Sequence, residues 1–392
     1  MWFRTCAMLS LSVFLPLPIL ATPAAAQAAD TMTPALLAVQ DAPVPFRGSD
    51  GQVHLVYELW ITNFSSSDIA VERVEVLGDG AVLQTLDRTA VENRLQPVGQ
   101  RQSTGTLAKS TQALLFLNVA LGSGVAIPQE LSHRVTVGLS AAPPGMQQVS
   151  ESGGKTRVDK QAVVEIGAPL AGERYISADS CCDATRHTRA ALPVNGRVWI
   201  SQRYAVDWEQ MSSDGKIYTG PQEKLESYAI FGQRVLAVAD ARVVSVIDGL
   251  PEQTPGKFPA NIPLTEADGN SVTLDLGAHR YAMYAHMQPG SIRVKAGDRV
   301  KAGQMIGLVG DSGNSIVPHL HFQVTDGPSS FSANGLPYEI RSFEVTGKTP
   351  GTAAFDEAET NGTPLPVTVI SPPQKVTGAM PLDQRVITFA GH

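Results

Sequence analysis

Residues 318–322 read Pro-His-Leu-His-Phe, and this short stretch decides how the surrounding chain folds. Polar and apolar side chains alternate along it, which is typical of a β-strand with one face buried. His319 and His321 therefore share one face, and the leucine and phenylalanine point into a core. An upstream alternating segment, residues 281–286, ends in a third histidine, His286. Three imidazoles gathered on one sheet face predict a metal site or a proton-transfer site.

The composition indicates a β-rich chain of two or three domains. Among 392 residues, 43% are hydrophobic and 17% are charged, and there are 35 glycines and 27 prolines. This mixture is typical of β-domains with many turns and excludes a coiled coil or a disordered chain. The formal net charge is −7 and no Lys/Arg-rich run occurs, so we expect no nucleic-acid partner.

The N-terminus has the pattern of a secretory signal peptide over residues 1–28. Arg4 supplies the positive charge, residues 8–20 are apolar, and Ala26-Gln27-Ala28 offers small residues for cleavage. No later segment has about 18 uninterrupted apolar residues, so we expect an exported chain with no membrane span after processing.

Cys181 and Cys182 are the two cysteines beyond the signal peptide, and they are adjacent. An oxidising compartment favours a disulfide between them, although neighbouring Cα atoms are close together for such a bond. A structural zinc site needs more cysteines than these two. We therefore interpret the pair as a structural clip.

Residues 30–168 are predicted to form an immunoglobulin-like β-sandwich. Short alternating segments follow one another with turns between them and without a helical period. The segments with the clearest alternation are residues 53–61, 69–77, 113–119 and 133–139. No histidine cluster or pair of carboxylates occurs there, so we expect a binding or spacing role.

The second domain is expected over residues 193–346, after a linker at 169–192 that contains the two cysteines. Residues 232–238 and 297–309 resemble each other, as expected of a β-roll in which the chain passes repeat. Between them lies a proline-rich segment, residues 248–269, and long loops of this kind commonly form the wall of a cleft. Residues 347–392 show little periodicity and are predicted to be an irregular tail.

Several motifs of the second domain occur in a specific order. They are Asn270–Leu276 (NSVTLDL), Tyr284–Met287 (YAHM), Val300–Gly307 (VKAGQMIG), Gly310–Ser315 (GDSGNS) and Pro318–Phe322 (PHLHF). Together they resemble the lysostaphin/LytM-type zinc endopeptidases, which are β-roll enzymes (the duplicated hybrid motif) that cut peptide cross-links in bacterial peptidoglycan. The resemblance covers about a third of the chain and implies an all-β fold, with the sandwich followed by the LytM-like β-roll.

The resemblance also implies roles for individual residues. Asp207 and His321 would be ligands of one zinc ion, and His286 and His319 would flank the metal-bound water and the developing oxyanion. Imidazole and carboxylate groups suit zinc, and a nearby histidine can move a proton at neutral pH.

One position departs from the family pattern. Where the family has a ligand histidine four residues before the aspartate, this chain has Arg203, and a guanidinium cannot bind zinc. Arg203 could pair with Asp207 and replace the charge of the metal. Alternatively, Glu209, His187 or His279 fills the vacant position, or zinc binds through Asp207, His321 and one further histidine. The sequence leaves these alternatives open.

Two functions follow from the resemblance. The first is an exported zinc metalloendopeptidase that hydrolyses peptidoglycan cross-links in the bacterial periplasm, at the cell envelope or outside the cell. The second is a non-catalytic LytM-like module that binds cell-wall peptide or activates a partner cell-wall hydrolase. The retained site residues favour the first, and Arg203 favours the second.

Overall fold

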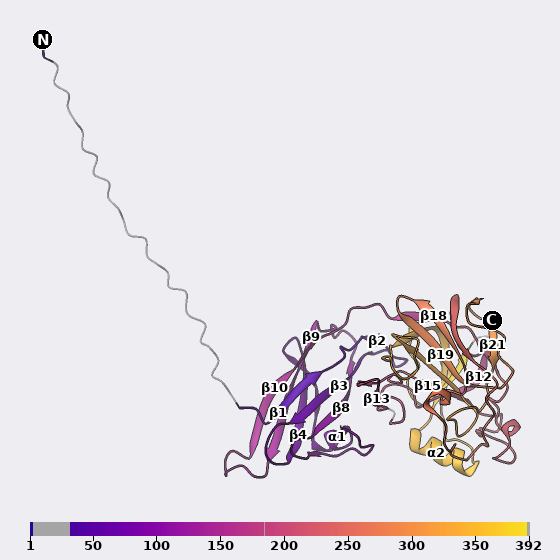
Figure 1. Cartoon of the computed structure of the whole chain (residues 1–392), viewed down its shortest axis with the longest axis horizontal. Coiled ribbons are helices and arrows are strands. Elements are labelled where there is room, and N and C mark those ends of the chain that lie inside the picture. The colour runs from indigo at the N-terminus through magenta and orange to yellow at the C-terminus, as the bar shows by residue number, and fades with distance from the viewer. Residues whose placement is uncertain (3–31, 184, 390–392) are drawn as a thin grey trace. The chain divides into compact units, whose positions relative to one another are not determined.

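The computed structural model describes residues 1–2, 32–183 and 185–389 of the chain (Figure 1). The predicted signal peptide lies outside the described residues, except for its first two positions, and stays a prediction. Strands dominate the described part, which confirms the all-β prediction. Residues from Pro34 onward form one unit. No helix in the described part is both long enough and apolar enough to cross a membrane.

The first part of this unit is a sandwich of two antiparallel sheets, coloured indigo to magenta in Figure 1. One sheet has the order β1-β3-β8-β6, with β2 beside β3, and the other has the order β10-β9-β4-β5, with β7 beside β4. Their bounds are β1 (Ala35–Val39), β2 (Phe46–Arg47), β3 (Val53–Asn63), β4 (Ile69–Gly78), β5 (Ala81–Leu86), β6 (Leu95–Pro97), β7 (Thr106–Leu107), β8 (Gln112–Leu121), β9 (Glu130–Leu139) and β10 (Gln148–Arg157). The short helix α1 (Arg88–Glu92) connects β5 to β6. This strand order corresponds to the two sheets of immunoglobulin-like domains and supports that part of the prediction.

Strand β3 is buried on both of its faces. Leu55, Leu59 and their alternate neighbours lie in the core between the two sheets. On the opposite face, Val56 belongs to the core of the second part of the chain, and Glu58 is only 5% exposed. Side chains alternate along a strand. The side chains on one face of β3 therefore pack in the sandwich core, and those on the opposite face contact the second part of the chain.

The second part contains one large sheet with the order β11-β23-β25-β12-β15-β22-β19-β18-β17-β20, in which β24 also pairs with β23. The bounds are β11 (Val164–Ile166), β12 (Gly172–Ala178), β15 (Val206–Gln210), β17 (Ala241–Ile247), β18 (Asn270–Gly277), β19 (Arg280–Met287), β20 (Arg299–Val300), β22 (Leu320–Thr325), β23 (Tyr338–Lys348), β24 (Thr368–Ala379) and β25 (Arg385–Phe389). Two smaller sheets are formed by β13 (Leu192–Val194) with β14 (Arg197–Trp199), and by β16 (Arg234–Leu236) with β21 (Met305–Leu308). The helical elements are η1 (Leu225–Ser227), η2 (Leu264–Glu266) and α2 (Thr352–Asn361).

The alternating pattern of the sequence explains how the central strands pack. Leu320, Phe322 and Val324 of β22 are fully buried in one hydrophobic core with Trp208 of β15. The two segments that resemble each other in sequence pair directly, because Arg234 in β16 lies opposite Leu308 in β21. Because the apolar side chains of β22 occupy one face of the central strands, the opposite face can carry polar groups.

Two boundaries predicted from the sequence are wrong. Residues 347–392 are not an irregular tail, because β24, β25 and α2 fall within them and both strands belong to the large sheet. Residues 169–192 are not only a linker, because they contain β12, which pairs with β15 and β25. The second domain therefore includes elements from both sides of the predicted range.

Candidate metal centre

Neighbouring strands place Asp207, His286 and His321 close together. Asp207 in β15 lies directly opposite His321 in β22, and His321 lies opposite Ala285 of β19, the residue before His286. His319 stands one residue before β22 and shares the face of His321, as the alternation predicts. The ring centroids of His286 and His319 are 4.7 Å apart, and those of His286 and His321 are 5.9 Å apart.

His286 and His319 both direct their Nδ1 atoms at backbone carbonyl oxygens. These contacts measure 2.8 Å from His286 to Ser312 and 2.8 Å from His319 to Val317. Since a carbonyl only accepts, Nδ1 of each ring carries a proton. Nε2 of His319 lies 3.5 Å from Oδ1 of Asp207. His286 also has a φ of 60°, and its backbone N–H donates to Asp268 at 2.9 Å. Such a conformation is uncommon outside glycine and is concentrated at functional sites.

His187 completes this group from outside the strands. It belongs to residues 179–191, called the His187 loop below, whose described residues form turns and bends. Its Nε2 lies 3.3 Å from Oδ2 of Asp207, and its ring stands edge-on to that of His321 at 4.9 Å. Its Nδ1 donates to the carbonyl oxygen of Asp179 at 2.9 Å. Metal-binding histidines commonly donate their second ring N–H to a carbonyl in this way.

The donor atoms of His187, Asp207 and His321 all lie within 4.8 Å of one another, so these residues could hold a metal ion. Nδ1 of His321 lies 2.9 Å from Oδ1 of Asp207, and its Nε2 lies 2.9 Å from Oε1 of Gln323. We call His187, Asp207 and His321 the ligand trio. It contains both ligands named from the sequence, and its third member is one of the three replacements considered for the position of Arg203.

Burial and mutual charge set the protonation of these groups. Burial raises the pKa of Asp207, but the three nearby histidines outweigh it and hold that pKa well below its usual range. Burial lowers the pKa of His187 to about 4, and it holds the pKa of His286 well below its ordinary value. Burial also lowers the pKa of His321, but the hydrogen bond to Asp207 outweighs it and the net shift is upward. Asp207 is thus ionised and His187 and His286 are neutral, whereas His321, whose pKa is shifted upward, would have to lose a proton to bind a divalent metal.

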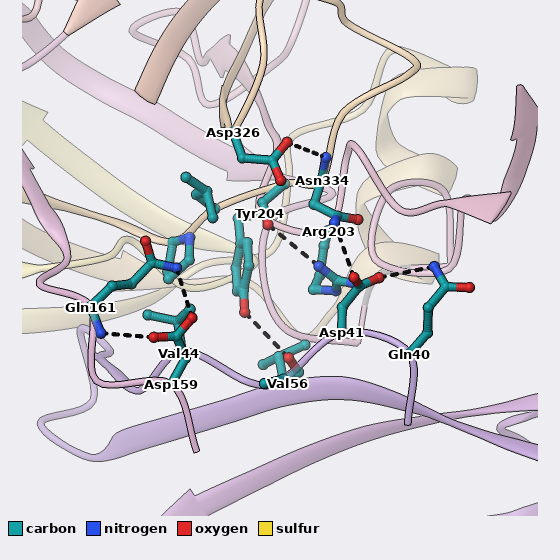
Figure 2. Close-up of a pocket in the computed structure, with 14 residues that line it drawn as sticks. Gln40, Asp41, Val44, Val56, Asp159, Gln161, Arg203, Tyr204, Asp326 and Asn334 are labelled. Atoms are coloured by element: carbon teal, nitrogen blue, oxygen red, sulfur yellow. Dashed lines mark hydrogen bonds between the residues drawn. The ribbon is translucent and has the colours of Figure 1, made fainter. Parts of the chain in front are cut away.

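Arg203 does not pair with Asp207, so that interpretation of the substitution is wrong. Its Nε and NH2 atoms bind the two carboxylate oxygens of Glu58 in β3 at 2.9 and 2.7 Å, and both residues are 5% exposed. Figure 2 shows Arg203 beside Asp41 and Asn334, lining a separate cavity of about 230 Å³. The position at which the family pattern expects a metal ligand therefore connects the β-roll to the sandwich.

The other two replacements considered for Arg203 are not in the ligand trio. Glu209 is buried on the same strand as Asp207, and burial together with the nearby carboxyl of Glu359 in α2 raises its pKa well above the usual range. His279 is exposed in the turn between β18 and β19, at the opposite end of β19 from His286. The contact between Glu209 and Glu359 could not be predicted from the sequence, because α2 falls in the predicted tail.

Cys181 and Cys182 are joined by a disulfide within the His187 loop. Both side chains are buried, at 1% and 8% exposure, and belong to the large hydrophobic core. The pair therefore fixes the loop to the core a few residues before His187.

A groove of about 780 Å³ contains the polar site. The ligand trio, His286 and His319 all contribute to its lining. Leu264, Ala267 and Asp268 of the long proline-rich loop form part of the wall, as the sequence predicted, and the sandwich contributes Trp60, Leu114 and residues 96–101.

Comparison with known proteins identifies the family that this region resembles. Residues 226–333 match the model of Peptidase family M23. Glycyl-glycine endopeptidase ALE-1 of Staphylococcus capitis is 48% identical over 68 residues, which are 17% of this chain and 17% of that protein. Lysostaphin of Staphylococcus simulans is 42% identical over 74 residues, 18% of this chain and 14% of that protein. The resemblance to the lysostaphin/LytM-type family is confirmed for this region, although the match spans only about a sixth of these relatives' length.

Solved structures of the same kind also align with the chain. The catalytic domain of lysostaphin from Staphylococcus simulans is 22% identical and covers 42% of this chain and 88% of its own, with a TM-score of 0.23. A zinc-containing peptidase from Vibrio cholerae is 16% identical and covers 75% of this chain and 85% of its own, with a TM-score of 0.26. At such TM-scores neither structure assigns a role to any residue here.

Proposed function

We propose that this protein is an exported zinc metalloendopeptidase that hydrolyses peptide bonds in peptidoglycan cross-links. One observation carries the proposal: His187, Asp207 and His321 converge to within 4.8 Å, beside two further histidines in one groove. A glycyl-glycine endopeptidase among the relatives supports the choice of substrate. The predicted signal peptide supports action in the periplasm, at the cell envelope or outside the cell.

The ligand trio fits zinc by its chemistry. Two imidazoles and one carboxylate are the usual protein ligands of a catalytic zinc, which keeps a fourth position open. The carbonyl of Asp179 behind His187 and the amide oxygen of Gln323 behind His321 are suitable second partners for those rings. We assign zinc binding to His187, Asp207 and His321.

Two histidines are left to handle protons. A bound zinc ion would polarise the scissile carbonyl and lower the pKa of its water. In His286 and His319 the Nδ1 atom donates to a fixed carbonyl, so Nε2 is the nitrogen left for chemistry, and in His319 it lies 3.5 Å from Oδ1 of Asp207. The low pKa of His286, caused first by burial, keeps its ring neutral at pH 7. We assign His319 and His286 to accepting a proton from the attacking water and to stabilising charge on the substrate oxygen.

Metal analysis of the processed protein tests the ligand assignment. We expect about one zinc per chain in the unmodified protein and in a His279→Ala control, since His279 is an exposed histidine remote from the groove. His187→Ala and Asp207→Ala should lose the zinc. No zinc in the unmodified protein, even after reconstitution, would reject the proposal.

A cleavage assay separates the enzyme from the alternative. Purified peptidoglycan incubated with the zinc-loaded protein should release new amino groups, and His319→Ala should keep the zinc but release none. Binding of peptidoglycan without cleavage, or a gain of cleavage only when a partner hydrolase is added, would instead support the non-catalytic module.

A further inference from the structure

His187 differs from the other two members of the ligand trio in how it is held. Asp207 and His321 sit on paired strands, and the register between β15 and β22 fixes their separation. His187 lies in a loop whose described residues belong to no strand or helix. Its position therefore depends on side-chain and backbone contacts made by the residues on either side of it.

One set of contacts ties the beginning of the His187 loop to the β-roll. The backbone N–H of Ser180 donates to Oδ1 of Asp383 at 3.1 Å, and its hydroxyl donates to the carbonyl of Pro381 at 2.8 Å. The N–H of Asp383 donates to the carbonyl of Cys181 at 2.9 Å. These contacts lie six or more residues before His187. Nearer to the histidine, Arg186 pairs with Asp179 and with Asp356 of α2, so the second part of the chain also holds the residue immediately before it.

A second set ties the residues flanking His187 to the sandwich. Asp183 uses both carboxylate oxygens, one toward NH2 of Arg94 at 2.7 Å and the other toward NH2 of Arg189 at 2.6 Å. Arg189 then donates through NH1 to the backbone carbonyl of Asn93 at 2.5 Å. Asn93 and Arg94 directly follow helix α1 of the sandwich. The four residues form a closed ring of contacts, and His187 lies between Asp183 and Arg189 in the sequence.

We propose that the sandwich positions the third metal ligand: Arg94 and Asn93 hold Asp183 and Arg189, and through them His187, at the ligand trio. This inference rests on the proposed function, because it concerns the same metal site. It gives the sandwich a role in the metal centre, in addition to the binding or spacing role expected from its sequence. Asn93, Arg94, Asp183 and Arg189 are positioning residues and do not themselves touch the metal or the substrate.

The contacts are sheltered enough to hold a loop in place. The side chains of Arg94, Asp183 and Arg189 are 27%, 37% and 9% exposed, so water and salt screen them less than a fully exposed pair. The sandwich is itself anchored to the β-roll by the buried pair of Arg203 with Glu58. The Arg203–Glu58 pair holds the sandwich in place, and the ring of contacts holds the His187 loop to the sandwich. Together they restrict the position of a ligand that lies in a loop.

The test compares zinc affinity among full-length variants. Arg94→Ala and Asp183→Ala should each raise the zinc dissociation constant about tenfold, the low end of the loss seen when an outer partner of a ligand is removed. Arg94→Lys, which keeps the charge, should lose less. The matched control is Arg88→Ala, since Arg88 lies in α1, just before Arg94, and among the described residues its ion pairs are with Glu72 and Glu92.

Further measurements distinguish an effect on the position of His187 from a general loss of folding stability. Zinc affinity is measured by competition with a chelating dye, and the visible spectrum of the cobalt-loaded protein reports the ligand geometry. Thermal unfolding of the metal-free variants should match that of Arg88→Ala, and amide exchange over residues 185–190 should be faster only in Arg94→Ala and Asp183→Ala. An affinity and a cobalt spectrum equal to those of Arg88→Ala would overturn the inference while leaving the proposed function standing. An unmodified protein that binds no zinc would overturn both.

Discussion

Replacing Arg203 by the histidine that the family pattern expects should damage this protein without restoring a ligand. The guanidinium binds both oxygens of Glu58, and each residue is only 5% exposed. Removing one partner of a buried ion pair leaves the other charge without compensation and costs about 3–5 kcal/mol. Arg203→His should therefore lower the folding equilibrium constant by roughly two to four powers of ten, since about 1.4 kcal/mol is tenfold.

Denaturant unfolding of the metal-free protein, followed by tryptophan fluorescence, measures this loss without a contribution from zinc. The double variant Arg203→Met with Glu58→Met should recover most of it, because well-packed apolar residues commonly replace a buried pair at little cost. In a His187→Ala background, Arg203→His should not bring back zinc binding, since the side chain at 203 points to Glu58. A loss below about 1 kcal/mol, smaller than that expected for a buried pair, or recovered zinc in that background, would refute this reasoning.

Three further predictions concern other parts of the molecule. His286→Ala and His319→Ala should each retain zinc while abolishing cleavage, and a variant that cleaves normally would remove that residue from the mechanism. His133 is fully buried in the sandwich, and burial lowers its pKa to about 4, so its contribution is complete above the unfolded pKa of 6.5 and is lost as pH falls toward 4. His133 should contribute about 2 kcal/mol to the drop in unfolding free energy between pH 7 and 5. A His133→Gln variant whose unfolding free energy drops as much as that of the unmodified protein would contradict this assignment. Gly310→Ala should cost about 1–3 kcal/mol and reduce cleavage, because its Cβ would meet backbone atoms beside His286 at 2.6 and 2.7 Å, and unchanged thermal unfolding would argue against that clash.

Much of the site was predictable because alternation along a strand is a local property. His319 and His321 share a face whatever the rest of the chain does, and the apolar residues between and after them enter the core. The place of Asp207 beside them came from the family resemblance, and the pairing of β15 with β22 now gives its physical reason.

The proposed third ligand could not be chosen from the sequence, because nothing local distinguishes His187 from His279 or Glu209. A loop has no period that assigns its side chains to a face, so its position depends on partners far away in the chain. The nearest hint was the adjacent cysteine pair, which marks a loop that is tied down. Even that hint does not indicate which residue of the loop lies at the proposed metal site.

Strand β24 was missed for a different physical reason. Strand β24 pairs only with β23, and most of its residues are exposed on both faces, including Pro372 and Pro373. A strand at the edge of a sheet needs no alternation of polar and apolar residues, and proline is tolerated there. The sequence pattern that identifies buried strands is therefore absent, although the backbone still extends the sheet.

Two contacts of the sandwich bear on the proposed metal centre. Arg203, in the turn before β15, points toward β3 and binds the buried carboxylate of Glu58. The sandwich fixed by that pair also presents Arg94 to Asp183 and thereby supports the loop that carries His187. On this reasoning, Arg203, which stands where the family pattern has a metal ligand, also anchors the sandwich. The proposed ligand His187 depends on contacts with that sandwich. Zinc affinity should then respond to substitutions in the sandwich as well as in the β-roll, which is not expected of a β-roll that carries all of its own ligands.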